Sequence, residues 1–124
     1  MKSKHKGRHA PAFILLAIAL EPNHGLGILN KLQEIAPGNR LDTAVIYRKL
    51  SEMEKTGCIT SQWVESEAGP KKKVYKITEH GMEQLQEFKV DIERSMATLN
   101  CFLKSYENEV MKEEKPDGKM EANV

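Results

Sequence analysis

Two sets of side chains in this sequence could bind a phosphate-rich partner. The first is a run of adjacent lysines, Lys71, Lys72 and Lys73, which follows a Gly-Pro pair in a polar stretch. Three neighbouring ammonium groups on a protruding loop can contact a phosphate backbone or enter a groove between phosphates. The second set mixes hydroxyl groups, cations and a methyl group at helical spacing: Thr43, Ala44, Tyr47, Arg48, Lys49 and Ser51. Such groups can contact base edges and phosphates, although each set alone also fits a solvated surface.

The residue types used for catalysis and metal binding are scattered. Among the histidines only His5 and His9 have the i, i+4 spacing of a metal pair, in a segment that we do not expect to be helical. Cys58 and Cys101 stand 43 residues apart with no second pair at metal spacing, which favours reduced thiols; a redox role for either is left open. No Ser or Cys is combined with His and a carboxylate in a catalytic pattern. We expect no enzyme activity, no metal and no other cofactor.

Charge is distributed unevenly along a chain whose 124 residues suit a single domain. Residues 1–80 carry 13 basic and 8 acidic side chains, whereas residues 81–124 carry 6 and 10. A basic first part can meet a polyanion while an acidic second part stays clear of it. The apolar run at 10–20 spans 11 residues, fewer than the roughly 20 needed to cross a bilayer, and no cleavage pattern follows it. It predicts a buried helix in a cytoplasmic protein without a membrane partner.

The elements that would position these side chains follow from hydrophobic periodicity. Three short helices are predicted: from Pro11 to Leu20, between Asn23 and Pro37, and from an Asp42 cap to Gly57. The period then changes to two, which predicts strands at 59–65 and 73–78, joined by a polar loop at 66–72. In the third helix the inward positions are Ile46, Leu50 and Met53. The polar set on that helix is thereby turned outward.

A last helix, capped by Thr78, is predicted to run far beyond this small domain. Its apolar residues recur at spacings of three and four for about seven turns. So small a domain cannot bury that whole stripe, and a second copy of the chain is expected to cover it. The predicted dimerisation residues on this helix are Leu85, Phe88, Ile92, Met96, Leu99 and Leu103.

Together these elements predict a mostly α (α+β) fold: a winged helix-turn-helix with a two-stranded wing and a long C-terminal dimerisation helix. The predicted organisation is a flexible basic arm at 1–9, the winged domain at 10–78, the dimerisation helix at 79–110 and a disordered tail at 111–124. In such a fold one helix enters the major groove of DNA, and a two-fold dimer matches two half-sites. Both polar sets are therefore predicted to bind DNA.

Several motifs resemble the PadR family of winged-helix transcriptional regulators. They are Ile46 to Leu50, Glu54 to Ile59, Trp63, Gly69 to Lys73, and Tyr75 to Thr78 with Gly81. The resemblance covers roughly residues 10–104, and the single last helix is similar to the short branch of the family. That branch dimerises through its first and last helices, which implies that Phe13 and Leu16 on the first helix also take part in dimerisation. It implies a dimeric repressor that leaves its operator when a small molecule or stress signal acts on the dimer. It also implies that Tyr47 lies on the recognition helix and that Lys71 to Lys73 form a basic wing.

The sequence departs from the family pattern in three places. Asp42 and Ala44-Val45 replace a Ser cap and a Gly-Thr pair, and a carboxylate at that cap would face phosphates unless capping occupies it. Leu26 stands where Tyr is common. The last helix lacks the tryptophan that stacks on aromatic drugs in the short branch, and the single tryptophan, Trp63, is expected to pack under the hairpin. A small effector cavity between subunits could still be lined by Phe88, Met96 and Phe102.

Two hypotheses follow. The first is a sequence-specific DNA-binding regulator, a homodimeric repressor that binds a two-fold symmetric operator in double-stranded DNA and is released by a small-molecule or stress signal. The alternative is a winged-helix protein-interaction module that modulates another regulator, with Asp42 marking a face unsuited to phosphate. A steep fall of DNA affinity with salt would favour the first. The sequence leaves open the operator, the regulated genes, the effector, the direction of regulation and the dimer geometry.

Overall fold

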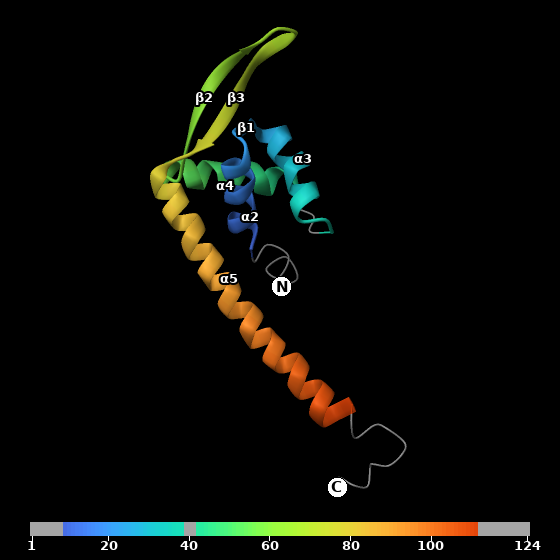
Figure 1. The fold of residues 1–124 in the computed structure, drawn as a ribbon. Helices are drawn as coiled ribbons and strands as arrows, with labels where there is room; N and C mark the ends of the chain where they lie inside the picture. The colour runs from blue at the N-terminus through green and yellow to red at the C-terminus, as the bar shows by residue number, and fades with distance from the viewer. Residues whose placement is uncertain (1–8, 39–41, 112–124) are drawn as a thin grey trace. The chain divides into compact units, whose positions relative to one another are not determined.

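The three short helices, the hairpin and the last helix follow the predicted order in the computed structural model, which describes residues 9–38 and 42–111 and adds a short strand that was not predicted between the first two helices. The elements are α2 (Ala10–Leu20), β1 (Asn23–His24), α3 (Gly25–Ile35), α4 (Thr43–Lys55), β2 (Ile59–Ser66), β3 (Gly69–Ile77), α5 (Glu79–Ser105) and a π-helical segment (Tyr106–Met111). In Figure 1, α2, α3 and α4 lie together at the base of the hairpin formed by β2 and β3. The mostly helical winged helix-turn-helix predicted from the sequence is confirmed. Apart from His9 and Met111, the predicted arm at 1–9 and tail at 111–124 lie outside the described residues.

Helix α2 is apolar on all sides, so its sequence alone does not identify the inner face. The face against the core carries Ile14, Leu15 and Ile18, each at most 1% exposed. Phe13 and Leu16 are only half-buried in the single chain. The helix therefore contributes one side to the core and leaves a second apolar side partly uncovered.

Helix α4 begins and ends where its sequence predicts. An oxygen of the Asp42 carboxylate accepts a hydrogen bond from the backbone N–H of Val45 at 3.0 Å, which satisfies a free donor of the first turn. After the last turn the chain reverses at Gly57, whose φ of +84° disfavours a side chain. The inward positions are confirmed, because Ile46, Leu50 and Met53 are all buried. The opposite face of α4 is consequently free to carry the polar set.

The hairpin is longer than the sequence predicts, and the loop assigned to residues 66–72 is wrong. Strand β3 already begins at Gly69, and Ser66 pairs with Gly69 across a turn of two residues. The register shifts between Val64 and Ser66, which accommodates an extra residue in the facing segment of β3, between Gly69 and Lys72. This segment is rich in Gly, Pro and Lys, a composition typical of a loop. It forms strand because its backbone groups find hydrogen-bond partners on the facing strand. Strand β1 adds a short third strand on the other side of β3, giving the antiparallel order β1-β3-β2.

The core joins the three helices to the base of this sheet. Its largest fully buried side chains are Ile14, Leu15, Ile18, Ile28, Ile46, Leu50 and Ile59. Tyr75 on β3 completes it from the sheet side and is 6% exposed. Since α2, α3, α4, β2 and β3 all contribute buried side chains, the helices and the base of the wing form a single packed body.

The start of α5 is tied to the turn between α4 and β2. Thr78 acts as the predicted cap: its hydroxyl oxygen accepts a hydrogen bond from the N–H of Gly81 at 3.0 Å. The same hydroxyl group lies 2.6 Å from the carbonyl oxygen of Gly57, to which it can donate. A side chain at position 81 would overlap the carbonyl oxygen of Cys58, so the close approach requires glycine.

Helix α5 belongs to both compact units into which the chain divides after Phe88. In the first unit, Leu85 and Phe88 pack against the core. In the second unit the helix continues to Ser105, and its large apolar side chains are mostly exposed. No helix within 9–38 and 42–111 is both long and apolar enough to cross a membrane.

Candidate nucleic-acid interface

The polar set on α4 forms one exposed face, as predicted. Thr43, Ala44, Tyr47, Arg48 and Ser51 are all exposed, and their spacing of one, three, one and three residues keeps them on one side of the helix. Lys49 differs from the rest of the set. It is half-buried, and its ammonium nitrogen lies 3.8 Å from a carboxylate oxygen of Glu52. The face available to a partner therefore consists of a methyl group, three hydroxyl groups and one guanidinium group.

Tyr47 is held in place by the first helix of the helix-turn-helix. Its ring lies so close to Gly25 that a side chain at position 25 would overlap it. Tyr47 as a whole residue is 47% exposed, and its hydroxyl oxygen is the atom nearest to the position that a side chain at Gly25 would occupy. A hollow of about 30 Å³ beside the ring is lined by Gly25, Leu26, Leu29, Thr43, Ile46 and Tyr47. It is an order of magnitude smaller than the 300 Å³ or more of typical small-molecule sites.

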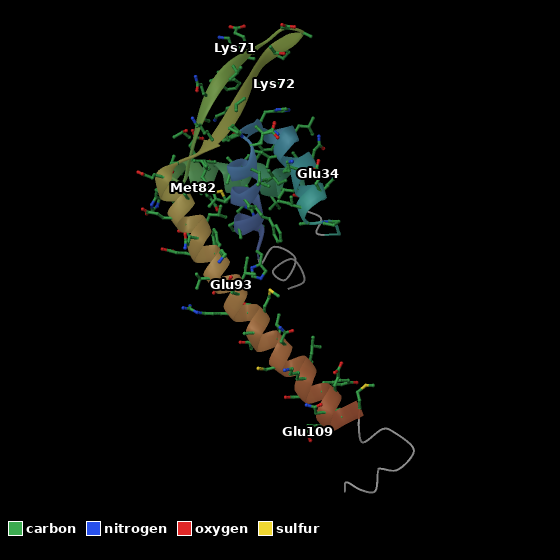
Figure 2. All side chains as sticks on the ribbon, in the orientation of Figure 1. Glu34, Lys71, Lys72, Met82, Glu93 and Glu109 are labelled. Carbon is green, nitrogen blue, oxygen red and sulfur yellow. The ribbon has the colours of Figure 1, made fainter. Side chains whose placement is uncertain are left out.

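The three wing lysines do not share one position at the hairpin tip, because the tip is the Glu67–Ala68 turn. Lys71 and Lys72 lie toward the far end of the hairpin in Figure 2 and are exposed. The ammonium nitrogen of Lys71 is 3.7 Å from a carboxylate oxygen of Glu65, and both side chains are well exposed. Surface pairs of this kind are weak, so Lys71 can exchange that partner for a phosphate.

Lys73 differs from the other two lysines. Its ammonium nitrogen lies 3.7 Å from a carboxylate oxygen of Glu54 and 5.7 Å from the centre of the Tyr75 ring. The second carboxylate oxygen of Glu54 accepts a hydrogen bond from the hydroxyl group of Ser61. Glu54 is not among the residues predicted for the interface, because a single helical glutamate carries no signal of a partner 19 residues away.

Trp63 does not pack under the hairpin, contrary to the sequence expectation. It is 63% exposed, even though alternation along β2 places it on the same side as buried Ile59. The helices cover only the base of the hairpin, so that side of the strand passes from buried at Ile59 to exposed at Trp63. Its cross-strand partner is Lys73. The wing therefore exposes an aromatic side chain beside a cation.

Tyr75 lies beneath this surface and has a shifted pKa. Burial raises its pKa above the ordinary value of 10.0, and the nearby Glu54 carboxylate and Tyr47 hydroxyl group act in the same direction. The phenol is therefore neutral at physiological pH. It contributes packing and a ring face for Lys73 rather than charge.

The residues predicted for dimerisation and for an effector cavity have different surroundings. Phe13, Leu16, Leu85, Phe88 and Ile92 are half-buried, whereas Met96, Leu99, Phe102 and Leu103 are exposed. In the second unit the rings of Phe102 and Tyr106 stack, with centroids 6.4 Å apart. The hollow on the helix-turn-helix includes none of the predicted cavity residues.

Across 9–38 and 42–111, no three His, Cys, Asp or Glu side chains are grouped as a metal site would require.

Comparison with known proteins places this geometry in a family. Residues 14–87 match the transcriptional regulator PadR-like family. A PadR-like transcriptional regulator from Bacillus cereus is 33% identical, with a TM-score of 0.69 over 82% of this chain and 96% of its own. A PadR-like transcription factor from Bacteroides fragilis is 27% identical, with a TM-score of 0.67 over 82% and 96% of the two chains. A search of curated proteins found no match.

A third structure supports the fold alone. It is a PadR family transcription regulator from Clostridium difficile, 22% identical with a TM-score of 0.68 over 77% of this chain and 98% of its own. The family match covers the helices, the wing and the first turns of α5, which are the elements that carry the exposed α4 face and the wing lysines. This chain belongs to the PadR-like family and is a DNA-binding transcriptional regulator.

Proposed function

We propose that the chain acts as a homodimeric repressor that reads a two-fold symmetric operator with α4 and the wing. The observation that carries this proposal is the exposed α4 face, which gathers Thr43, Ala44, Tyr47, Arg48 and Ser51 on one side. Arg48 can bond guanine or phosphate, and the hydroxyl groups of Tyr47 and Ser51 can donate to phosphates. Thr43 and Ala44 come first on the helix, where recognition helices approach base edges. Action on chromosomal DNA agrees with the cytoplasmic location expected from the sequence.

A second copy of the chain is the proposed partner of the apolar surfaces. Leu99 and Leu103 on α5 are 61% and 56% exposed, which is unusual for leucines that recur on one helix face. The half-buried Phe13 and Leu16 supply apolar surface on α2. A symmetric dimer that covers these faces would present two copies of α4 to two half-sites.

Release by a small molecule is the further part of this proposal. The hollow beside Tyr47 is too small for an organic effector. The effector site in this proposal is completed by the second subunit, with Phe88, Met96 and Phe102 as its apolar lining. Met96 has the flexible side chain that suits an adaptable cavity.

The structure weakens the reason for the alternative role as a protein-interaction module. That reason is the carboxylate of Asp42, which would repel phosphates at the start of α4. The carboxylate is engaged as a cap by the N–H of Val45 and lies at the positive end of the helix dipole, which offsets its charge. The α4 face therefore remains compatible with DNA.

The test is selection of genomic fragments with the purified protein, followed by binding at several salt concentrations to an enriched duplex and to a scrambled duplex. We expect a two-fold symmetric site with a steep salt dependence. Arg48→Ala should weaken binding to the enriched duplex by about 1 to 3 kcal/mol. Lys89→Ala, which removes a charge from α5 outside α4 and the wing, is the matched control. Equal and salt-insensitive binding to both duplexes would instead support the protein-interaction module.

A further inference from the structure

One carboxylate ties the end of α4 to both strands of the wing. Glu54 lies in the last turn of α4, and its two oxygens have different partners. One accepts a hydrogen bond from the hydroxyl group of Ser61 on β2. The other is 3.7 Å from the ammonium nitrogen of Lys73 on β3. No other side chain of α4 within the described residues forms a hydrogen bond or ion pair with the hairpin.

This tie lies at the point where the hairpin leaves the core. Ser61 pairs with Tyr75, which is buried, whereas the next pair on the same face joins Trp63 to Lys73. Beyond Ser61, the β2 side chains from 62 to 65 are all exposed. The orientation of the outer hairpin relative to α4 therefore depends on contacts made at its base, which include the pairing of β1 with Val74 and Tyr75 and the side-chain contacts of Glu54.

We propose that Glu54 is a positioning residue that holds the wing in a fixed orientation to the recognition helix, and that Lys73 serves as its internal partner rather than as a phosphate contact. This inference deepens the proposed DNA-binding function and rests on it. A wing held in one orientation loses less conformational freedom when both reading elements engage DNA together. The Glu54 carboxylate also pairs with the Lys73 ammonium group, which could otherwise bind a phosphate in DNA of any sequence. The pair therefore favours binding to the operator over binding to random DNA.

The energetics agree with positioning rather than with fold stability. The side chains of Lys73 and Glu54 are 38% and 36% exposed, and ion pairs so close to solvent stabilise folds only weakly. Loss of the tie should therefore leave the domain folded while it frees the outer wing. Glu52 provides a matched comparison, because its carboxylate pairs with Lys49 inside the same helix rather than with a side chain of the wing.

The first experiment uses the free protein and no DNA. Trp63 is the only tryptophan, lies on the outer wing and is exposed, so its time-resolved fluorescence anisotropy reports wing motion. Glu54→Ala should at least double the amplitude of the fast depolarisation, with the thermal midpoint close to that of the parent. Glu52→Ala should match the parent. If Glu54→Ala and the parent show the same amplitude, Glu54 does not hold the wing.

A more conservative variant is less prone to disturb folding, and it tests whether the Lys73 ammonium group can bind phosphate. Glu54→Gln keeps an oxygen for Ser61 but loses the ion pair, which releases the Lys73 ammonium group. On a scrambled duplex, the slope of log affinity against log salt should steepen by about 0.9, the value for one added phosphate contact. Lys73→Ala should keep the parent slope, whereas Lys72→Ala should make the slope shallower by about 0.9, because one phosphate contact is lost.

Two results would overturn the assignment, and they separate it from the proposed function. A slope for Lys73→Ala that falls as far as that for Lys72→Ala would make Lys73 a phosphate contact. An unchanged slope for Glu54→Gln would show that the pair does not withhold a cation. If the parent binds no duplex at all, the DNA-binding function fails, while the anisotropy of the free protein still decides whether Glu54 holds the wing.

Discussion

The two units of this chain differ in the exposure of their apolar side chains. In the first, Ile28 and Leu50 are 0% exposed, because helices and sheet of the same chain surround them. In the second, Leu99 and Leu103 keep more than half of their surface exposed. Both units show helical spacing of apolar residues. The difference teaches that periodicity identifies a face that is to be buried, but does not identify what buries it.

The same substitution should therefore have unequal effects in the two units, and this is the largest expected difference. Leu50→Ala leaves a cavity in the core and should lower the free energy of unfolding by about 2 to 5 kcal/mol. Leu99→Ala should lower it by less than about 1 kcal/mol once the protein is diluted to monomers. Guanidinium unfolding at two protein concentrations measures both values. Equal losses that do not depend on concentration would mean that Leu99 is covered within its own chain.

Two glutamates introduced on the exposed face of α5 test whether that face is covered by a second copy of the chain. Leu99→Glu combined with Leu103→Glu places carboxylates where the dimer would exclude water, so self-association should weaken at least about a hundredfold. Sedimentation equilibrium measures that change. Circular dichroism should show an intact first unit, because neither residue belongs to its core. A variant that sediments like the parent would assign dimerisation to another surface.

The cap of α4 provides a smaller effect confined to the first unit. Asp42→Ala should destabilise the domain by about 1 kcal/mol, because the N–H of Val45 loses its acceptor. Asp42→Asn keeps an oxygen in place and should retain most of the stability. The same variant removes a negative charge and should raise affinity for a scrambled duplex. Equal stability of the alanine variant and the parent in a thermal melt would contradict the capping role.

The smallest expected effect is the dependence of stability on alkaline pH. Because the pKa of Tyr75 is raised in the folded state, the folded protein holds this proton at a pH where the unfolded chain has released it. Stability from this source is complete below pH 10.0 and is lost as pH rises through the higher folded pKa. Tyr75→Phe removes this group and should flatten the decline of stability as pH rises above 10.0, which unfolding experiments at a series of alkaline pH values measure.

Several features of the fold were predictable because their causes are local. The α4 helix follows from its cap at Asp42, its inward residues at spacings of four and three, and the reversal at Gly57. The same spacing predicts which α4 side chains are exposed, and the structure confirms that face. The Thr78 cap is local as well, because its acceptor role depends on the N–H of Gly81 three residues later.

The errors lie in the hairpin, where the causes are not local. Gly69 to Lys72 have the composition of a loop but form strand, since a partner strand is available to pair with them. Trp63 has the alternation of a buried residue but is exposed, since the helices end before they reach it. Glu54 gains its role from Ser61 and Lys73, which only the folded chain brings together.

The sequence by itself therefore determined the element order, the inner and outer faces of α4, the uneven charge and the membership of a DNA-binding family. Spacing and caps act over three or four residues, so these features are readable along the chain. Only the tertiary structure decided how far the wing projects, which lysines remain available to phosphate and which residue holds the wing to α4. Those properties depend on where packed helices end and on pairs distant in sequence, and no local pattern records them.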